Sequence, residues 1–311
     1  MELKKISSFL NKKNHISDLV LKGFSIYYLM FLFVSFVLIY LSGGALVLAP
    51  DHLFLLLLSF IIIFNKGGEM IRSFSKYFIL LASYDALSGF VPFLNSYVNY
   101  NAPIQFDTFI GGGLLPTKIL QTALEPFQPS INIIMVFFYT LHFFIPFIFG
   151  AILWFKRKEL YEYFFLSFIV ASYLGLLTFL ILPVAPPWLA AQKGLIDIRH
   201  ITLEVDLQNN IVSMPSIYYF FNANPVAAFP SLHFAYPMIT AYFVILGFGK
   251  KTAPIAILYP LIMGISIIYL GEHYILDIIG GTAYAIISII LSGYIINSYN
   301  TSSLSKIYDT L

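Results

Sequence analysis

Long apolar stretches alternate with short polar segments along most of the chain. Short segments such as Lys-Arg-Lys at 156–158 and Gly-Lys-Lys at 249–251 separate the apolar stretches, as turns do. The apolar stretches reach the length of about 20 residues that a membrane-spanning helix needs. They cover residues 24–42, 45–64, 76–98, 131–155, 161–182, 229–248, 253–270 and 274–297. This pattern predicts an all-α, polytopic membrane bundle of about eight transmembrane helices.

Composition agrees with a protein embedded in a lipid bilayer and excludes several functions. Of the 311 residues, 59% are hydrophobic and only 10% are charged, whereas a soluble domain has about 25% charged residues. The chain has no cysteine, which excludes disulfides, thiol catalysis and cysteine-ligated metals. No basic patch of the kind that binds nucleic acid is visible. The sequence gives no indication of oligomeric state.

The distribution of Lys and Arg predicts the orientation in the membrane. With the N-terminus in the cytoplasm, 14 of the 17 basic residues fall on the inner side, and only Lys118, Lys193 and Arg199 fall outside. Both termini are then cytoplasmic. The long loops 99–130 and 183–228 lie on the outer or lumenal face. The N-terminal basic region is followed by an apolar run of spanning length, which indicates a retained helix instead of a cleaved signal peptide.

The spans group into one membrane domain with an extension. We predict an N-terminal cytoplasmic segment and two added transmembrane helices in residues 1–75, a six-helix catalytic core in residues 76–297, and a cytoplasmic tail in residues 298–311. Within the first long outer loop, the apolar spacing of GGGLLPTKILQTALEPF, residues 111–127, predicts a short helix at the membrane interface.

Two histidines mark the ends of neighbouring spans. His233 lies at the outer start of span 229–248, and His273 follows the outer end of span 253–270. Since a tight hairpin joins these spans, both histidines lie at the same membrane face. Asp277 follows His273 at i+4, a spacing that places two side chains on one face of a helix.

This set of residues suits phosphoryl transfer. A carboxylate at Asp277 can fix the tautomer of His273 and leave one ring nitrogen free as a nucleophile. His233 can then act as a general acid, while Ser231 offers a hydroxyl and a backbone N–H at a helix start, where phosphates bind readily. Two alternatives remain open from the residues alone: packing histidines, or a zinc site of His, His and Asp, although no HExxH spacing supports it.

The same residues carry a resemblance to the type-2 phosphatidic acid phosphatase superfamily. That family has a Pro-Ser-Gly-His motif and a later Ser-Arg-x5-His-x3-Asp motif. Here the first reads PSLH at 230–233, and the second reads Ser266-Ile267, five residues, His273, three residues, Asp277. Leu232 replaces the Gly and Ile267 replaces the Arg, while the family's earlier Lys-x6-Arg-Pro motif has no match.

The departures resemble one branch, the inositol phosphorylceramide synthases and their prokaryotic relatives. Further stretches over about residues 100–285 look like that branch. They are FDTFIGGGLLPTKILQ at 106–121, HFFIP at 142–146, APPW at 185–188 and YLGEHYILDIIGG at 269–281. The resemblance implies transfer of a phosphate-bearing headgroup, such as phosphoinositol, between lipids. Hydrolysis of a lipid phosphate or isoprenoid diphosphate is the alternative, followed by a transporter or a non-catalytic membrane protein.

The resemblance also implies the roles of the residues. His273, oriented by Asp277, would form a phosphohistidine, and His233 would protonate the leaving oxygen and later deprotonate the acceptor. No metal or cofactor is required in this family. Because the family's Arg and Lys are missing, we expect Lys118 or, second, Arg199 with His200 to hold the phosphate charge. Asp107 is a candidate for binding an acceptor headgroup or capping a helix, and His142 for the site or for core packing.

Overall fold

The computed structural model describes residues 67–209 and 224–308, together with positions 26 and 30. The predicted spans 24–42 and 45–64 lie outside the described residues, apart from those two positions. Within the described part, regular structure is helical apart from two isolated bridges that join Asn99, Val184 and Ala227. The protein is therefore an all-helical membrane bundle, as the apolar pattern predicts.

Five of the predicted spans correspond to single helices. They are α7 (Ser130–Lys156), α8 (Lys158–Ile181), α12 (Leu232–Phe248), α13 (Ala253–Tyr269) and α14 (Ile275–Tyr308). By length and composition, four stretches can cross a membrane: Ser130–Lys156, Lys158–Ile181, Lys250–Tyr269 and Ile275–Ser298. The apolar helix α12 is shorter, at 17 residues. The chain is thus a multi-pass membrane protein.

The predicted span 76–98 has different bounds in the structure. A helix, α3 (Gly67–Ser88), begins nine residues earlier, and a single turn, α4 (Val91–Leu94), follows it. Pro92 lies in that turn, where its missing N–H and fixed φ are compatible only with the start of a helix. The apolar run therefore continues through a break in the backbone that hydropathy does not register.

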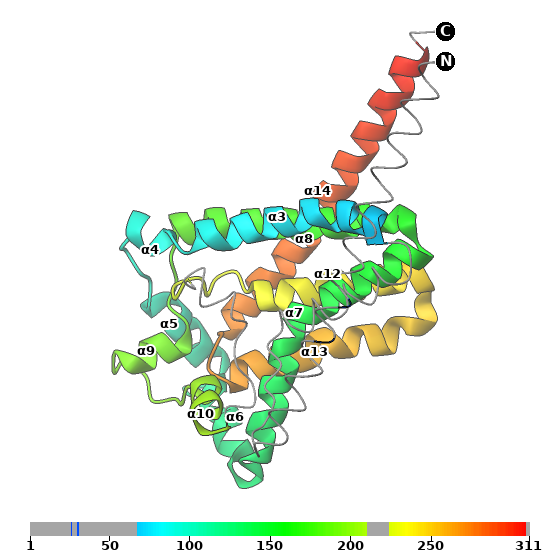
Figure 1. Cartoon of the computed structure of the whole chain (residues 1–311). Helices are drawn as coiled ribbons and strands as arrows, with labels where there is room; N and C mark the ends of the chain where they lie inside the picture. Colours follow the sequence, from blue (N-terminus) through cyan, green and yellow to red (C-terminus); the bar gives the residue numbers. More distant parts are fainter. Residues whose placement is uncertain (1–25, 27–29, 31–66, 210–223, 309–311) are drawn as a thin grey trace.

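Short helices occupy the two long loops. The first contains α5 (Asn101–Ile110), α6 (Pro116–Leu124) and the 3-10 turn η2 (Glu125–Phe127), and the second contains α9 (Pro187–Gln192) and α10 (Ile201–Asn209). The expected short helix within residues 111–127 is α6, which begins at a proline, a favoured first residue. These short helices gather at one end of the bundle, and the α7–α8 and α12–α13 turns lie at the other (Figure 1).

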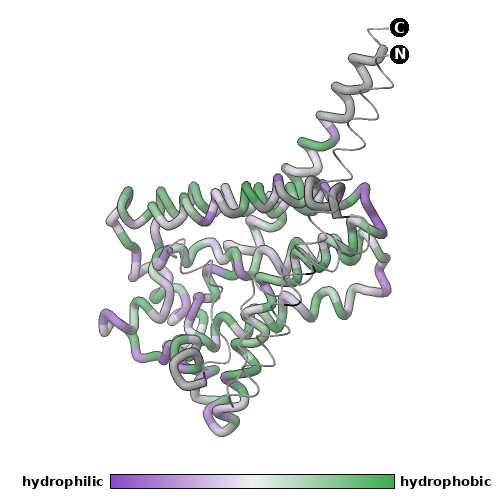
Figure 2. Tube along the Cα trace, in the orientation of Figure 1, coloured by the Kyte–Doolittle hydropathy of each residue, from purple (hydrophilic) through white to green (hydrophobic). Residues whose placement is uncertain are grey.

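Aromatic side chains fill the centre of the bundle. Phe164, Phe165 and Phe168 of α8 are almost fully buried and belong to a cluster with residues of α3, α7 and α12. Gly150 of α7 admits this packing, because a Cβ there would lie 2.5 Å from the ring of Phe165. Hydrophilic residues concentrate at the turns (Figure 2). The core therefore fixes α8 and α12 side by side.

The α12–α14 contact is close at the end of α12 where His233 lies. A Cβ at Gly281 of α14 would lie 2.4 Å from the backbone oxygen of Ser231. Backbone cannot move aside as a flexible side chain can, so glycine is needed here for the two helices to approach. At the far end of α12, the atoms nearest to a Cβ at Gly247 would all belong to side chains, the closest being that of Leu160 at 3.3 Å.

We predict that Gly281→Ala separates α12 from α14 and destabilises the protein by about 1–3 kcal/mol, the usual range for overpacking. Gly247→Ala is the matched control on α12 and should cost less. Thermal unfolding of both variants in the same detergent measures the difference. Equal melting temperatures for the two variants would contradict the close backbone contact.

Candidate active site

The start of α12 places His233. Ser231 is the N-cap of this helix, and its Oγ accepts a hydrogen bond from the N–H of Phe234 at 3.3 Å. The Ser231 N–H donates to the backbone oxygen of Asp277 at 3.0 Å. Pro230 lies just before the cap. The N–H of fully buried Ser231 therefore holds the start of α12 against α14, while its Oγ caps α12 itself.

His273 lies in the segment that joins α13 to α14. It precedes the first residue of α14, Ile275, so the expected pair of His273 and Asp277 on one continuous helix face is not what forms. The histidine is instead in the connection, and Asp277 is in the first turn of α14. Gly271 makes the connection possible: its φ is +83°, and a Cβ would lie 2.8 Å from the backbone oxygen of Arg199.

The two histidines and the aspartate form a continuous chain of contacts. His273 Nδ1 lies 3.2 Å from Asp277 Oδ2, and His273 Nε2 lies 2.8 Å from His233 Nδ1. The other nitrogen of His233, Nε2, lies 3.3 Å from the hydroxyl of Tyr139 on α7. Asp277 Oδ2 also accepts the N–H of Tyr274 at 2.9 Å. His273 and Asp277 are buried, with exposed fractions of 3% and 0%.

Donor and acceptor chemistry assigns the protons along this chain. The carboxylate of Asp277 can only accept, so His273 Nδ1 carries a proton and His273 Nε2 has a free lone pair. That lone pair accepts the proton on His233 Nδ1. His273 Nε2 is therefore in the protonation state that a nucleophile needs. The 2.8 Å contact leaves no space for a phosphorus atom, so a substrate must separate the two rings.

A comparison with protein families identifies the superfamily of this chain. The family model described as the PAP2 superfamily matches residues 113–291, more than half of the chain, including both histidine motifs. The protein belongs to the PAP2 superfamily. The family resemblance of the sequence is confirmed.

The chain is also similar to a curated protein that carries a functional name. Over 153 residues the chain is 34% identical to a phosphoinositol dihydroceramide synthase of Bacteroides thetaiotaomicron, a match that covers 46% of this chain and 49% of the relative. The chain therefore matches about half the length of that relative. No solved structure matches the chain.

The two cations predicted to hold the phosphate in this PAP2-superfamily protein are paired with carboxylates. Lys118 Nζ lies 2.7 Å from Asp197 Oδ2 in an exposed ion pair. Arg199 pairs with Glu204 through two guanidinium nitrogens and donates from Nη1 to Gln128 at 2.7 Å. The structure does not bring either cation into contact with the histidine pair. Their role in binding phosphate stays a prediction.

His200, the neighbour of Arg199, also has a structural partner. Its Nε2 lies 3.0 Å from the carboxylate of Glu272, and the ring stacks on Trp188 at a centroid distance of 5.0 Å. Trp188 donates its backbone N–H to the oxygen of Gly271. These contacts hold the connection that carries His273 against the second long loop.

Asp107 caps a helix, one of the two roles considered for it. This fully buried carboxylate on α5 accepts the backbone N–H groups of Ile275 at 2.8 Å and Leu276 at 3.2 Å. Both donors belong to the first turn of α14, which has no intrahelical partners for its N–H groups. Asp107 therefore fixes the start of α14 between His273 and Asp277. Binding of an acceptor headgroup by Asp107 stays a prediction.

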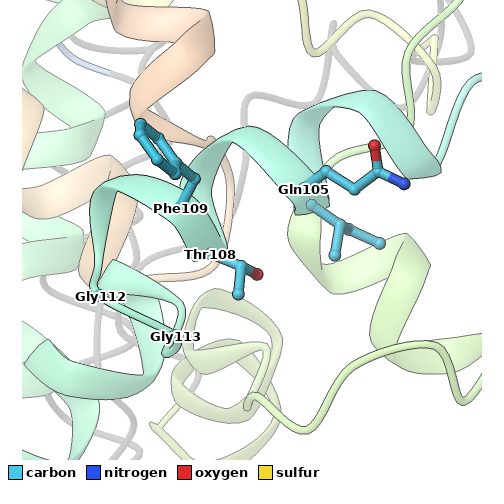
Figure 3. A pocket seen from close by; sticks show the side chains of 6 residues that line it. Gln105, Thr108, Phe109, Gly112 and Gly113 are labelled. Carbon is cyan, nitrogen blue, oxygen red and sulfur yellow. The ribbon is translucent and has the colours of Figure 1, made fainter.

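The opposite side of α5 is apolar and exposed. A shallow groove of about 530 Å³ runs along it, lined by Ile104, Gln105, Thr108, Phe109, Gly112 and Gly113 (Figure 3). The side chain of Phe109 is 81% exposed. An outward apolar face beside an inward carboxylate is the arrangement expected of a helix that contacts lipid.

Two residues of α7 extend the site. His142 is buried, and its ring lies 4.4 Å from that of His233, nearly perpendicular to it. Its Nδ1 hydrogen-bonds the backbone oxygen of Tyr139 in its own helix. Sequence reasoning missed Tyr139 altogether. Its position three residues before His142 was the available signal, because residues at i and i+3 share a helix face.

Metal ligation has no further support from geometry. Within residues 67–209 and 224–308, no group of three or more His, Asp or Glu side chains is arranged to hold a metal ion. The contacts of His233, His273 and Asp277 are instead the direct hydrogen bonds described above.

Burial gives Asp107 a testable pH dependence. Loss of water raises the pKa of Asp107 from 3.8 to about 6, although the N–H groups of Ile275 and Leu276 lower it in part. The folded protein then holds this proton up to about pH 6, while the unfolded chain releases it near pH 4. Folding stability should therefore fall as the pH rises from about 4 to 6, and stay level above.

We predict that Asp107→Asn removes this titration. The stability of the wild type relative to the variant should fall by about 3 kcal/mol between pH 4 and pH 7, since a rise of one pKa unit corresponds to about 1.4 kcal/mol. Thermal melts of both proteins across this range measure it. A difference that does not vary with pH would show that the carboxylate is not buried.

Proposed function

We propose that this protein transfers a phosphate-bearing headgroup between lipids through a phosphohistidine on His273. The observation that carries the proposal is the chain of contacts in which His273 Nδ1 bonds Asp277 at 3.2 Å and His273 Nε2 faces His233 at 2.8 Å. A ring held by a carboxylate on one nitrogen and facing a second imidazole on the other is arranged for nucleophilic and acid–base catalysis.

The first half-reaction forms a bond from His273 Nε2 to phosphorus and breaks the bond from phosphorus to the leaving oxygen. His233 Nδ1 gives its proton to that oxygen. In the second half-reaction an acceptor hydroxyl gives its proton to His233 Nδ1 and attacks phosphorus, which frees His273. Asp277 stabilises the positive charge that develops on the ring of His273 in each step.

The identity of the transferred group rests on membership in the PAP2 superfamily together with the similarity to a protein named phosphoinositol dihydroceramide synthase. We infer phosphoinositol as the headgroup and a lipid hydroxyl as the acceptor. The phosphate charge would be held by the backbone N–H groups of Leu232 and His233 at the start of α12, supplemented by Lys118 or Arg199 if their carboxylate partners are released.

We also propose that the site faces the exterior or an organelle lumen and that both termini are cytoplasmic. In support, Lys250 and Lys251 lie at the turn between α12 and α13, at the opposite ends of these helices from His233 and His273. Basic residues favour the cytoplasmic side. Residues 76–297 would form the six-helix catalytic core, with residues 1–75 and 298–311 as additions to it.

The proposal is tested with purified protein in detergent–lipid micelles, a phospholipid labelled in its phosphate, and an added acceptor lipid. We expect label in a new lipid with the wild type and none with His273→Ala. Label released only as a water-soluble phosphate would indicate hydrolysis in place of transfer. Equal signals from the wild type and His273→Ala would refute the phosphohistidine.

The role of Asp277 gives a separate prediction. Asp277→Asn should lower the rate of transfer by about 10³-fold, because an amide no longer fixes the tautomer of His273 as a carboxylate does. Glu159→Gln, at an exposed carboxylate in the first turn of α8, is the matched control and should keep full activity. A similar rate for both variants would remove Asp277 from the mechanism.

A further inference from the structure

When His233 acts as the general acid it needs a second proton, which neither His273 nor Asp277 supplies. A neutral imidazole carries one proton, and here that proton is on Nδ1, where it is shared with His273 Nε2 at 2.8 Å. If Nδ1 gives this proton to a leaving oxygen and Nε2 receives none, the ring becomes an imidazolate, which is a very strong base. Useful acid catalysis therefore requires a proton at Nε2 in the same step.

The group in contact with that nitrogen is a hydroxyl. Tyr139 Oη lies 3.3 Å from His233 Nε2, and the side chain of Tyr139 is 3% exposed. Because Nε2 of this tautomer has only a lone pair, the hydroxyl of Tyr139 is the donor. All hydrogen bonds then run in one direction, from Tyr139 through His233 and His273 to Asp277.

Packing holds this hydroxyl in place. The ring of Tyr139 lies 5.1 Å from that of His233, and the backbone oxygen of Tyr139 accepts a hydrogen bond from Nδ1 of His142. His142 in turn packs its ring against the ring of His233 at 4.4 Å. The contact with Tyr139 uses the nitrogen of His233 that does not face His273, so a phosphate that enters between the histidines need not displace it.

We propose that Tyr139 is a positioning residue that acts through His233, setting its tautomer and supplying the proton at Nε2 when Nδ1 protonates the leaving oxygen. This proposal rests on the proposed function. It adds to the histidine pair a third residue, on α7, that the family's two motifs do not contain.

The protons balance over the full reaction. In the first half-reaction one proton passes from Tyr139 Oη to His233 Nε2 and another from His233 Nδ1 to the leaving oxygen, while the bond from His273 Nε2 to phosphorus replaces the bond to that oxygen. Transfer in this direction is favourable because an alkoxide is a stronger base than a phenolate, whose acid form has a pKa of about 10. In the second half-reaction the acceptor hydroxyl returns a proton to Nδ1, and Nε2 returns one to Tyr139.

The test compares two donors that share a headgroup and differ in the leaving group. One is the phospholipid, whose diacylglycerol alkoxide must be protonated, and the other is the 4-nitrophenyl phosphodiester of the same headgroup, whose nitrophenolate leaves without a proton. Tyr139→Phe keeps the ring and removes the hydroxyl. The rate of the first half-reaction is measured for each donor in a single turnover without acceptor, as diacylglycerol formed or as the burst of nitrophenolate. We expect this variant to lose about 10²-fold in that rate on the phospholipid, the lower end of general acid–base effects, and to stay within about 3-fold of the wild type on the nitrophenyl donor.

Tyr161→Phe is the matched control. Tyr161 is a buried tyrosine in the core cluster, and its hydroxyl has no hydrogen-bond partner among the described residues. Removal of this hydroxyl should leave both rates unchanged. Melting temperatures of the two variants verify that each is folded.

The outcomes separate the relay from a structural role. Equal loss on both donors by folded Tyr139→Phe would indicate that Tyr139 only supports packing, and wild-type rates on both would show that its hydroxyl is not used; either result overturns the proposal. His273→Ala reports on the proposed function independently, because it should abolish turnover of both donors whatever Tyr139→Phe does. Hydrolysis in place of transfer would still pass through the same acid step and leave the comparison of leaving groups valid.

Discussion

The hydrogen bond between His233 and His273 is the constraint on which the rest of this structure depends. Two imidazole nitrogens 2.8 Å apart require that the start of α12 and the connection before α14 hold their positions to within a fraction of an ångström. Apolar packing sets the separation of helix axes at about 8–10 Å and the crossing angle to within about 15–20°, which is too loose to define a distance between two polar atoms. Backbone contacts and glycine supply what packing does not.

Several of these contacts converge on the same few residues. The N–H of Ser231 bonds the backbone of Asp277, and Gly281 lets α14 approach the backbone of Ser231. From the first long loop, Asp107 of α5 caps the first turn of α14, and Gln121 of α6 bonds the backbone of Tyr269 at the end of α13. The short helices α5 and α6 therefore support the connection that carries His273.

The sequence predicts the long membrane helices well, but it does not predict the helix breaks and the short helices that depend on tertiary packing. Apolar length alone defines α7, α8, α12 and α13 to within a few residues, because a lipid environment requires each span to satisfy its own backbone. The same signal fails at residues 76–98, where Pro92 and the residues around it break the helix without changing hydropathy. It also misses α5, α9 and α10, whose stability comes from packing on the bundle and not from a long apolar run.

The sequence by itself indicated His233, His273 and Asp277 as candidates and placed both histidines at the same end of a hairpin, because two consecutive spans return the chain to the side from which it left. Only the tertiary structure decided the partners. Asp107 reaches backbone 168 residues away, Lys118 and Arg199 end on carboxylates, and Tyr139 meets His233 from a helix 94 residues earlier. Contacts between residues that are far apart in the sequence depend on how the helices pack. The local pattern of apolar and polar residues does not specify that packing.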